Sequence, residues 1–254
     1  MVSDFENPAI AALAERIDPE FIWGQVGIRR NGGGSFELRH VDDAKADTGA
    51  LGQVQPADLR ALAETDALCQ FRPLKAAPNL RSGWLCEANG LTELETALRN
   101  LYPGSVADWY ALELGQAQPT SYHKFTERQT GMYRITAKLT SLQAKPAAEA
   151  CCHALSCLKQ RRWSMDDLPV EDTTHKSVLP CLEPCALMLE FARGVFRFEK
   201  HNGAIDEMTP EDHRNLLMAA ELAAEQAGPP NREADFAAPG NPRWMRYLRL
   251  RLGS

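Results

Sequence analysis

Five of the seven cysteines in this 254-residue chain lie between positions 151 and 185. Three stand in the segment CCHALSC and two in the segment PCLEPC, and the five are Cys151, Cys152, Cys157, Cys181 and Cys185. Thiolates bind soft metals, and four that converge can hold an iron–sulfur cluster. The spacing is C-x5-C, a gap of 23 residues and C-x3-C, or C-x4-C at the start if Cys152 replaces Cys151. The pattern predicts one 4Fe–4S cluster whose fourth ligand is either Cys151 or Cys152.

Zinc, a disulfide and a set of unrelated thiols stay open as alternatives to a cluster. Structural zinc prefers cysteine pairs with two to four intervening residues, so zinc fits the first pair only through Cys152. A disulfide or thiol switch is possible for some of the cysteines, although the odd total of seven argues against a complete disulfide framework. A set of unrelated thiols is disfavoured by the clustering. Outside the cluster, Cys69 and Cys86 are expected to be free buried thiols.

Prolines are expected to shape the second cysteine pair. Pro180 and Pro184 each precede a cysteine, lack a backbone donor and fix φ at about −65°. We expect a rigid turn that presents Cys181 and Cys185 on the same side. Pro184 also suits the first turn of a helix over residues 184–200. That helix would place the Cys185 sulfur near a helix N-terminus, where the partial positive charge favours a thiolate.

Four polar residues beside the cysteines are candidates for contact with a bound group. His153 would donate a hydrogen bond to a cluster sulfide, unless it is an ordinary surface histidine. Lys159, Arg161 and Arg162 form a basic run. This run predicts either a solvated helix end or a site for an anion such as a tetrapyrrole carboxylate. The sequence holds no Ser-His-Asp, G-x-S-x-G, H-E-x-x-H or P-loop pattern, so no class of enzyme is indicated.

Composition limits the class of protein and the compartment in which this site is expected. Hydrophobic residues make up 44% of the chain, enough for real cores. A net charge of −6 argues against nucleic-acid binding. No apolar run is long enough for a membrane span, and the N-terminal MVSDFENPAI lacks the basic region of a secretory signal. The expected compartment is the cytoplasm, where clustered cysteines more often bind metal or do redox work than form disulfides.

The elements that must position these residues are mixed in type. Alternating apolar runs on both sides of NGGG predict a β-hairpin. Helices are predicted over residues 90–104, 146–163, 184–200 and 209–228, and the second of them starts at Pro146 and carries three cysteines. The segment RWMRYLRLRL near the C-terminus alternates charged and apolar residues. It is expected to be an exposed strand or an amphipathic docking segment. The fold class predicted is α+β.

Two resemblances to known families add to this interpretation. The C-x5-C…C-x3-C spacing alone is similar to the cluster ligands of siroheme-dependent sulfite and nitrite reductases, and it favours Cys151. A second resemblance covers residues 8–200. Here GQVGIRRNGGGSFELRHVDD, ACCHALSCLKQRRW and PCLEPCALMLEFAR resemble the C-terminal extension of certain bacterial sirohydrochlorin chelatases. That extension is a stabilising domain followed by a 4Fe–4S-binding domain. Nothing here resembles the chelatase domains, so chelatase activity is not implied.

The second resemblance implies a layout and a cluster. It implies a hairpin and helix stabilising domain over residues 1–115, a small α+β cluster-binding domain over 116–205 and a helical tail over 206–254. The implied ligands are three fixed cysteines and one that is open between two neighbours: Cys157, Cys181, Cys185, and Cys151 or Cys152.

The function implied is electron transfer or redox support in siroheme or cobalamin synthesis. The partner would be a separate sirohydrochlorin chelatase or a siroheme-dependent enzyme. Two alternatives remain. In one, a cluster or zinc ion only staples the fold. In the other, the protein is an enzyme that acts on a tetrapyrrole or small anion at an open edge of the cluster.

Overall fold

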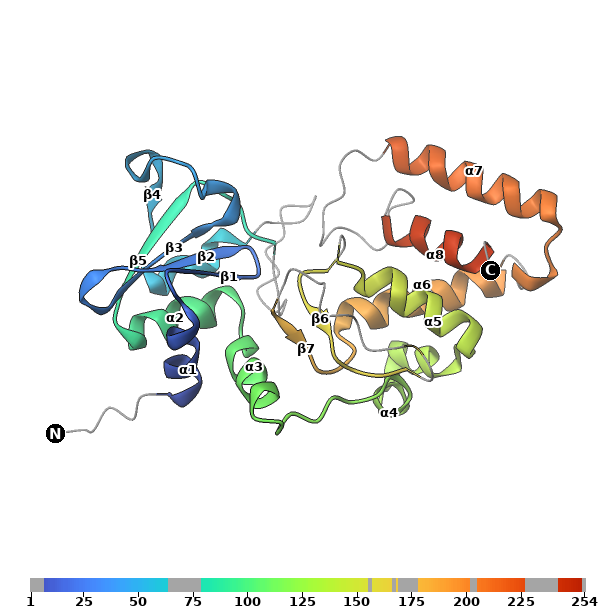
Figure 1. Ribbon diagram of the computed structural model, residues 1–254. Coiled ribbons are helices and arrows are strands. Elements are labelled where there is room, and N and C mark those ends of the chain that lie inside the picture. The colour runs from blue at the N-terminus through green and yellow to red at the C-terminus, as the bar shows by residue number, and fades with distance from the viewer. Residues whose placement is uncertain are drawn as a thin grey trace. The chain divides into compact units, whose positions relative to one another are not determined.

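The chain folds as an α+β protein with two units. The computed structural model describes residues 7–63, 79–154, 157–165, 168, 178–201, 205–226 and 242–252. Contacts group residues 1–117 and 176–180 into the first unit, and residues 118–175 and 181–254 into the second. The five-stranded sheet belongs to the first unit, and the longest helices belong to the second (Figure 1). The predicted fold class is confirmed.

The first unit is built on a five-stranded sheet. Its strands are Glu20–Trp23 (β1), Val26–Arg30 (β2), Ser35–His40 (β3), Gly52–Gln53 (β4) and Trp84–Asn89 (β5). Their spatial order is β1-β2-β3-β5-β4, and only β4 and β5 are parallel. The 3-10 turn Gly32–Gly34 joins β2 to β3, with Arg30 opposite Phe36. The predicted hairpin around NGGG is therefore confirmed.

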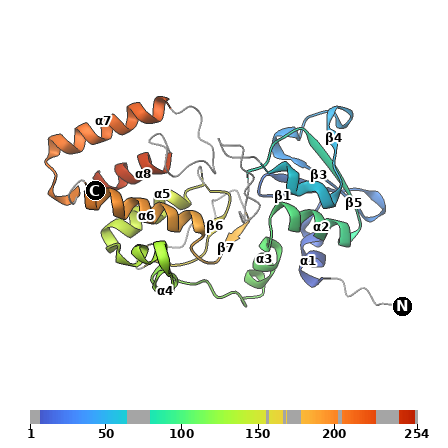
Figure 2. The ribbon, with the colours of Figure 1, turned by 180° about the vertical axis from the view of Figure 1, so that it is seen from behind.

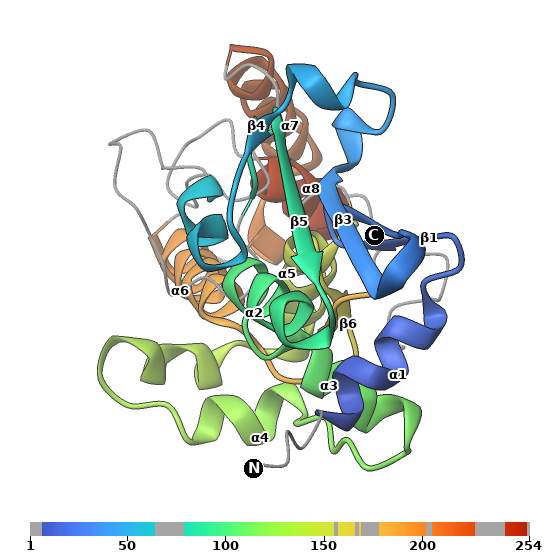
Figure 3. The same cartoon turned by 90° about the vertical axis from the view of Figure 1, so that its left-hand side faces the viewer.

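Helices cover this sheet on one side. They are Pro8–Arg16 (α1), Leu91–Leu101 (α2) and Ser105–Glu113 (α3), and short 3-10 turns span Val41–Asp43, Thr48–Ala50 and Pro56–Leu62. Figure 3 shows the three helices together below the strands, and α2 packs on β5. Leu94 and Leu98 lie one turn apart on α2, so they share one face of the helix, and both are buried. Cys86 on β5 is buried and free, as predicted, whereas Cys69 lies outside the described residues.

The second unit is mainly helical. Its elements are Tyr122–Glu127 (α4), the 3-10 turn Gly131–Lys138, Ser141–Cys152 (α5), Gln160–Arg161 (β6), Ala186–His201 (α6), the 3-10 turn Ile205–Glu207, Pro210–Gln226 (α7) and Pro242–Leu252 (α8). The strand Pro180–Cys181 (β7) spans the boundary between the two groups of residues. Helix α5 contacts both α6 and α8, and α8 lies between α5 and α7 (Figures 1 and 2). Trp163 and Phe191 are among the fully buried residues of this core.

The helix that carries the first cysteines differs from its prediction. It begins at Ser141, with Pro146 inside it, and ends at Cys152. A capping box explains the earlier start: the backbone N–H of Thr140 donates to the Gln143 side chain at 3.0 Å, and the Thr140 side chain accepts from the backbone of Gln143. The chain turns out of the helix at His153, so Cys157 lies beyond the helix rather than within it.

Of the two forms expected for RWMRYLRLRL, the exposed strand is wrong, because the segment is the helix α8. The other, an amphipathic docking segment, agrees with the packing of α8 on α5 and α7, and the expected helical C-terminal tail is confirmed. Arg243, Tyr247 and Arg251 are each four residues apart, so they share one face of a helix. That face is buried, although two of the three side chains are arginines. The alternation of charged and apolar residues suggested a strand because partners for the arginines lie far away in the sequence.

The predicted helix over residues 209–228 is confirmed as α7. Thr209 caps it, since the backbone N–H of Asp212 donates to the Thr209 hydroxyl oxygen at 3.2 Å. Among the helices that the structure describes, none is long and apolar enough to cross a membrane.

The turn between β1 and β2 generates a test of the first unit. Gly24 has a φ of +65°, and a Cβ atom there would lie 2.7 Å from Leu179 Cδ1 and 2.9 Å from the Tyr102 ring. We expect Gly24→Ala to lower the free energy of unfolding by about 3 kcal/mol, from backbone strain and overpacking together. Chemical denaturation measures this change.

Gly33→Ala is the matched control for that substitution. Gly33 also has a positive φ, +80°, but no atom lies within 4 Å of its added Cβ. Only strain remains, so the loss is expected to be about 1 kcal/mol. Equal losses for the two variants would contradict the steric part of the argument.

Candidate metal centre

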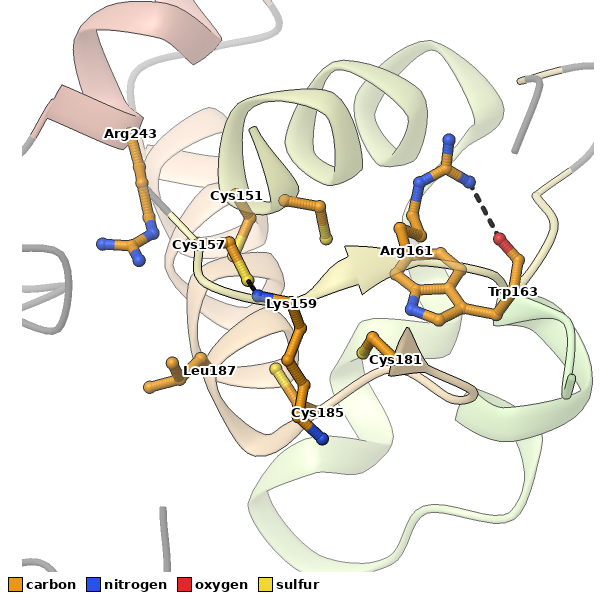
Figure 4. Close-up of a pocket in the computed structure, with 10 residues that line it drawn as sticks. Cys151, Cys157, Lys159, Arg161, Trp163, Cys181, Cys185, Leu187 and Arg243 are labelled. Carbon is orange, nitrogen blue, oxygen red and sulfur yellow. Dashed lines mark hydrogen bonds between the residues drawn. The ribbon is translucent and has the colours of Figure 1, made fainter. Parts of the chain in front are cut away.

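All five clustered cysteines line a single pocket in the second unit. Cys151, Cys152, Cys157, Cys181 and Cys185 line one small pocket that is partly open to solvent (Figure 4). The spacing of the cysteines predicted that the two sequence segments meet, and the structure places them together. The pocket is therefore the place in this chain where sulfur ligands gather.

Three elements bring the sulfurs to the pocket. Cys151 and Cys152 form the C-terminal end of α5, and the backbone N–H of Cys157 donates to the His153 carbonyl oxygen at 2.9 Å, which turns the chain back. β6 and β7 then pair as a two-stranded sheet. The Arg162 N–H donates to the Cys181 carbonyl oxygen at 2.9 Å. This short pairing is what joins the two halves of the cysteine pattern.

Cys185 stands immediately before the first residue of α6. Its sulfur accepts hydrogen bonds from the backbone N–H groups of Leu187 and Met188, in the way an N-cap side chain does. The predicted position of this sulfur at a helix N-terminus is confirmed. The helix itself begins at Ala186, so Pro184 precedes the cap instead of lying in the first turn.

At Cys185, hydrogen bonding and burial act on the pKa of the thiol in opposite directions. A hydrogen bond from the Cys181 thiol, helped by the two backbone donors and Lys159, lowers the pKa of Cys185 to about 6. The same hydrogen bond, together with burial, raises the pKa of Cys181. The one hydrogen of Cys181 has two acceptors within reach, because the Glu183 carbonyl oxygen also lies 3.2 Å from its sulfur.

Two further thiols are held in the neutral form when no metal is present. Burial raises the pKa of Cys157 to about 12, against the effect of a hydrogen bond from the Lys159 backbone at 3.4 Å. A hydrogen bond with Cys151, followed by burial, raises the pKa of Cys152. A metal that binds these sulfurs must displace their protons, so metal binding and proton release are coupled.

Three cations also line the pocket, and two of them belong to the predicted basic run. The Lys159 side chain extends along the cysteines in Figure 4. Arg161 Nη1 donates to the Trp163 carbonyl oxygen at 2.9 Å, and its guanidinium lies over the Trp163 ring. The third cation is Arg243 of α8. Sequence reasoning missed it because it follows the last cysteine by 58 residues.

The other two polar candidates lie elsewhere. His153 caps the C-terminal end of α5, and Arg162 follows β6. Neither is among the side chains that line the pocket. Their predicted contact with a bound group therefore remains a prediction.

The donor atoms of the pocket suit an iron–sulfur cluster. The lining residues include five thiols and no carboxylate, and soft sulfur donors select iron–sulfur clusters, zinc or copper(I). Within the described parts of the chain, no three His, Cys, Asp or Glu side chains are close enough to hold one metal ion in common. A 4Fe–4S cluster makes a different demand, because each of its thiolates binds its own iron.

Comparison with known proteins supports this assignment. Residues 114–194 match the 4Fe–4S iron–sulfur cluster binding domain, and residues 7–113 match the DR2241 stabilising domain. The crystal structure of DR2241 from Deinococcus radiodurans is similar to this chain, with 30% sequence identity and a TM-score of 0.61. It is described as a multi-domain protein with structural similarity to chelatases and with two additional novel domains. The alignment covers 76% of this chain and 41% of that one.

A search of curated proteins finds no match. The two family matches adjoin each other, and the second contains all five clustered cysteines. Residues 7–194 thus match, one after the other, the DR2241 stabilising domain and the 4Fe–4S iron–sulfur cluster binding domain.

Proposed function

We propose that the protein holds one 4Fe–4S cluster in the cysteine pocket and uses it for single-electron transfer or redox support in tetrapyrrole synthesis. The observation that carries the proposal is the convergence on one pocket of five sulfurs from two segments separated by 23 residues, all within the matched cluster-binding domain. When bound, a 4Fe–4S cluster supplies exchange of one electron at a time. The part of the pocket open to solvent gives a redox partner a side from which to approach.

The proposed ligands are three fixed cysteines and one of two neighbours. Cys157, Cys181 and Cys185 each influence the charge state of at least one other member of this trio. Cys151 is favoured as the fourth ligand because it gives the C-x5-C spacing. Cys152 also lines the pocket and interacts with Cys157, so it is the alternative.

The link to tetrapyrroles rests on the relative. DR2241 is described as similar to chelatases, and this chain aligns with 41% of it. We infer that the chain acts with a separate chelatase, such as a sirohydrochlorin chelatase, or with a siroheme-dependent enzyme. The proposed pathway is siroheme or cobalamin synthesis, in the cytoplasm.

A second candidate function is structural. A cluster or zinc ion bound here would cross-link the end of α5, β7 and the start of α6, and metals stabilise small domains in this way. The packed core around Trp163 and Phe191 speaks against a need for such a cross-link. Reversible one-electron reduction of the folded protein would support electron transfer. Zinc in place of iron, or loss of fold on reduction, would support the structural role.

The ligand assignment is tested by alanine substitutions in anaerobically purified protein. We expect Cys157→Ala, Cys181→Ala and Cys185→Ala each to reduce the iron content from about four atoms per chain to below about one, because a ligand of the cluster is lost. Iron and sulfide analysis with electron paramagnetic resonance of the reduced protein measures this.

Cys86→Ala is the matched control, since Cys86 is a buried free thiol in the first unit and should keep full iron. Cys151→Ala and Cys152→Ala decide the fourth ligand. A wild-type protein that is colourless and iron-free would refute the proposed function outright.

The metal-free protein offers a test by pH. The lowered pKa of Cys185, about 6, means that its alkylation by iodoacetamide should rise as pH increases through about 6 and then level off. Removing the donor with Cys181→Ala should raise the pKa and shift this profile to higher pH. Peptide mapping by mass spectrometry follows Cys185, with Cys86, whose pKa burial raises to about 12, as the unreactive reference. Equal profiles for both cysteines would contradict the assigned hydrogen bonds.

A further inference from the structure

Helix α8 brings a fully buried arginine to the cysteine pocket. Arg243 is 1% exposed and lines the same pocket as the five thiols. In Figure 4 its side chain lies on the side of the pocket where Cys151 and Cys157 lie. Its positive charge favours the thiolate of Cys157, in opposition to burial. Arg243 also lies beyond residues 114–194, so it is outside the matched cluster-binding domain.

A buried polar network fixes α8 against the helices that carry the cysteines. Glu199 on α6 accepts from the Tyr247 hydroxyl and from Arg251 Nε, the latter at 3.1 Å. The side chains of Arg251 and Glu199 are 5% and 2% exposed. Gln143 on α5 donates to the other Glu199 oxygen at 2.6 Å. One carboxylate therefore ties α8, α6 and α5 together.

Aromatic packing holds the same helix close to α6. The Trp244 ring lies 5.0 Å from the Phe191 ring and 5.5 Å from the Phe198 ring, measured between centroids. A Cβ at Gly194 would lie 3.1 Å from Trp244, so the absence of a side chain there permits the approach. With its neighbour Trp244 packed in this way and the network anchored one turn later, the backbone at Arg243 is held in place.

The three cations of the pocket are not equivalent. Lys159 is partly exposed, so water screens its charge. Arg161 is occupied with the Trp163 carbonyl oxygen and ring. Arg243 is the most deeply buried of the three, and a charge in a region of low dielectric acts more strongly on its neighbours.

We propose that Arg243 acts on the cluster through its charge. It is a fixed positive charge, supplied by α8, that favours the reduced state of the cluster and slows the loss of iron. The proposal rests on the cluster proposed above. A 4Fe–4S cluster with four thiolates is negatively charged, and one-electron reduction adds a further negative charge with no bond made or broken. A buried cation beside it stabilises the reduced form more than the oxidised form and so raises the reduction potential.

The test compares four proteins purified without oxygen: the wild type, Arg243→Gln, Arg243→Lys and Arg249→Gln. Arg249 lies on the same helix in an exposed ion pair with Glu221, so its substitution removes the same charge away from the pocket. Reductive titration with dithionite as electron donor gives the midpoint potential, and an iron chelator gives the rate of iron loss. Circular dichroism and iron analysis check fold and loading.

We expect Arg243→Gln to have a more negative midpoint potential and a several-fold faster loss of iron. Arg243→Lys keeps the charge but not the reach of the guanidinium, so its changes should have the same sign and be smaller. Arg249→Gln should match the wild type. Equal potentials and equal rates for wild type and a folded, iron-loaded Arg243→Gln would overturn the inference and leave the proposed function intact.

Three further outcomes are separable. If Arg243→Gln fails to fold or to load iron, Arg243→Met decides, because it also removes the charge but fills the buried space with an apolar side chain: a more negative potential or faster iron loss supports the role of Arg243, and wild-type values for both overturn it. If the wild type itself holds no iron, the proposed function fails first, and the role of Arg243 fails with it. A shift as large in Arg249→Gln would show that net charge alone is responsible and would also overturn the inference.

Discussion

The removal of five thiols from water into one shared pocket is the constraint on which the second unit depends. Burial favours the neutral thiol, whereas a metal needs the thiolate. The balance between these two effects differs from one thiol to the next. Cys185 receives hydrogen bonds from Cys181 and from two backbone N–H groups at the start of α6. Cys152, Cys157 and Cys181 stay protonated until a metal takes the place of their protons. The helix start, the β6–β7 pairing and the end of α5 are all needed to keep these sulfurs together.

The second unit also holds a buried charge whose partners are all within the protein. Glu199 is satisfied by Tyr247, Arg251 and Gln143, so its charge is already paired within the protein. Arg243 instead faces the pocket with the thiols. One buried network thus holds the helix in place, and the other buried cation on that helix acts on the site. The contacts of Tyr247 and Arg251 with Glu199 hold α8 in place, so the charge of Arg243 is not needed for that purpose.

Much of this could be predicted from local sequence. Gly-rich NGGG between alternating apolar runs predicted the β2–β3 hairpin, and the cysteine spacing predicted that two segments meet, because both signals lie within short stretches. The position of Cys185 at a helix N-terminus followed from the residues beside it. The start of α5 was missed although Thr140 and Gln143 form a recognisable capping box. The place of Arg243 in the pocket could not be predicted from the sequence. Its helix is held by contacts with Glu199 and by the packing of Trp244, and both are tertiary contacts. Alternating charges in α8 are informative only once the partners of those charges are known.

The order in which a ribosome makes this chain gives α8 one more consequence. All five cysteines emerge before Pro242–Leu252, which follows the last of them by more than fifty residues. Until α8 is made, Glu199 lacks two of its three partners and the pocket lacks one of its walls. A chain without α8 would therefore leave that side of the pocket open. The position of one helix in the sequence thus makes one wall of the pocket the last part of it to be synthesised.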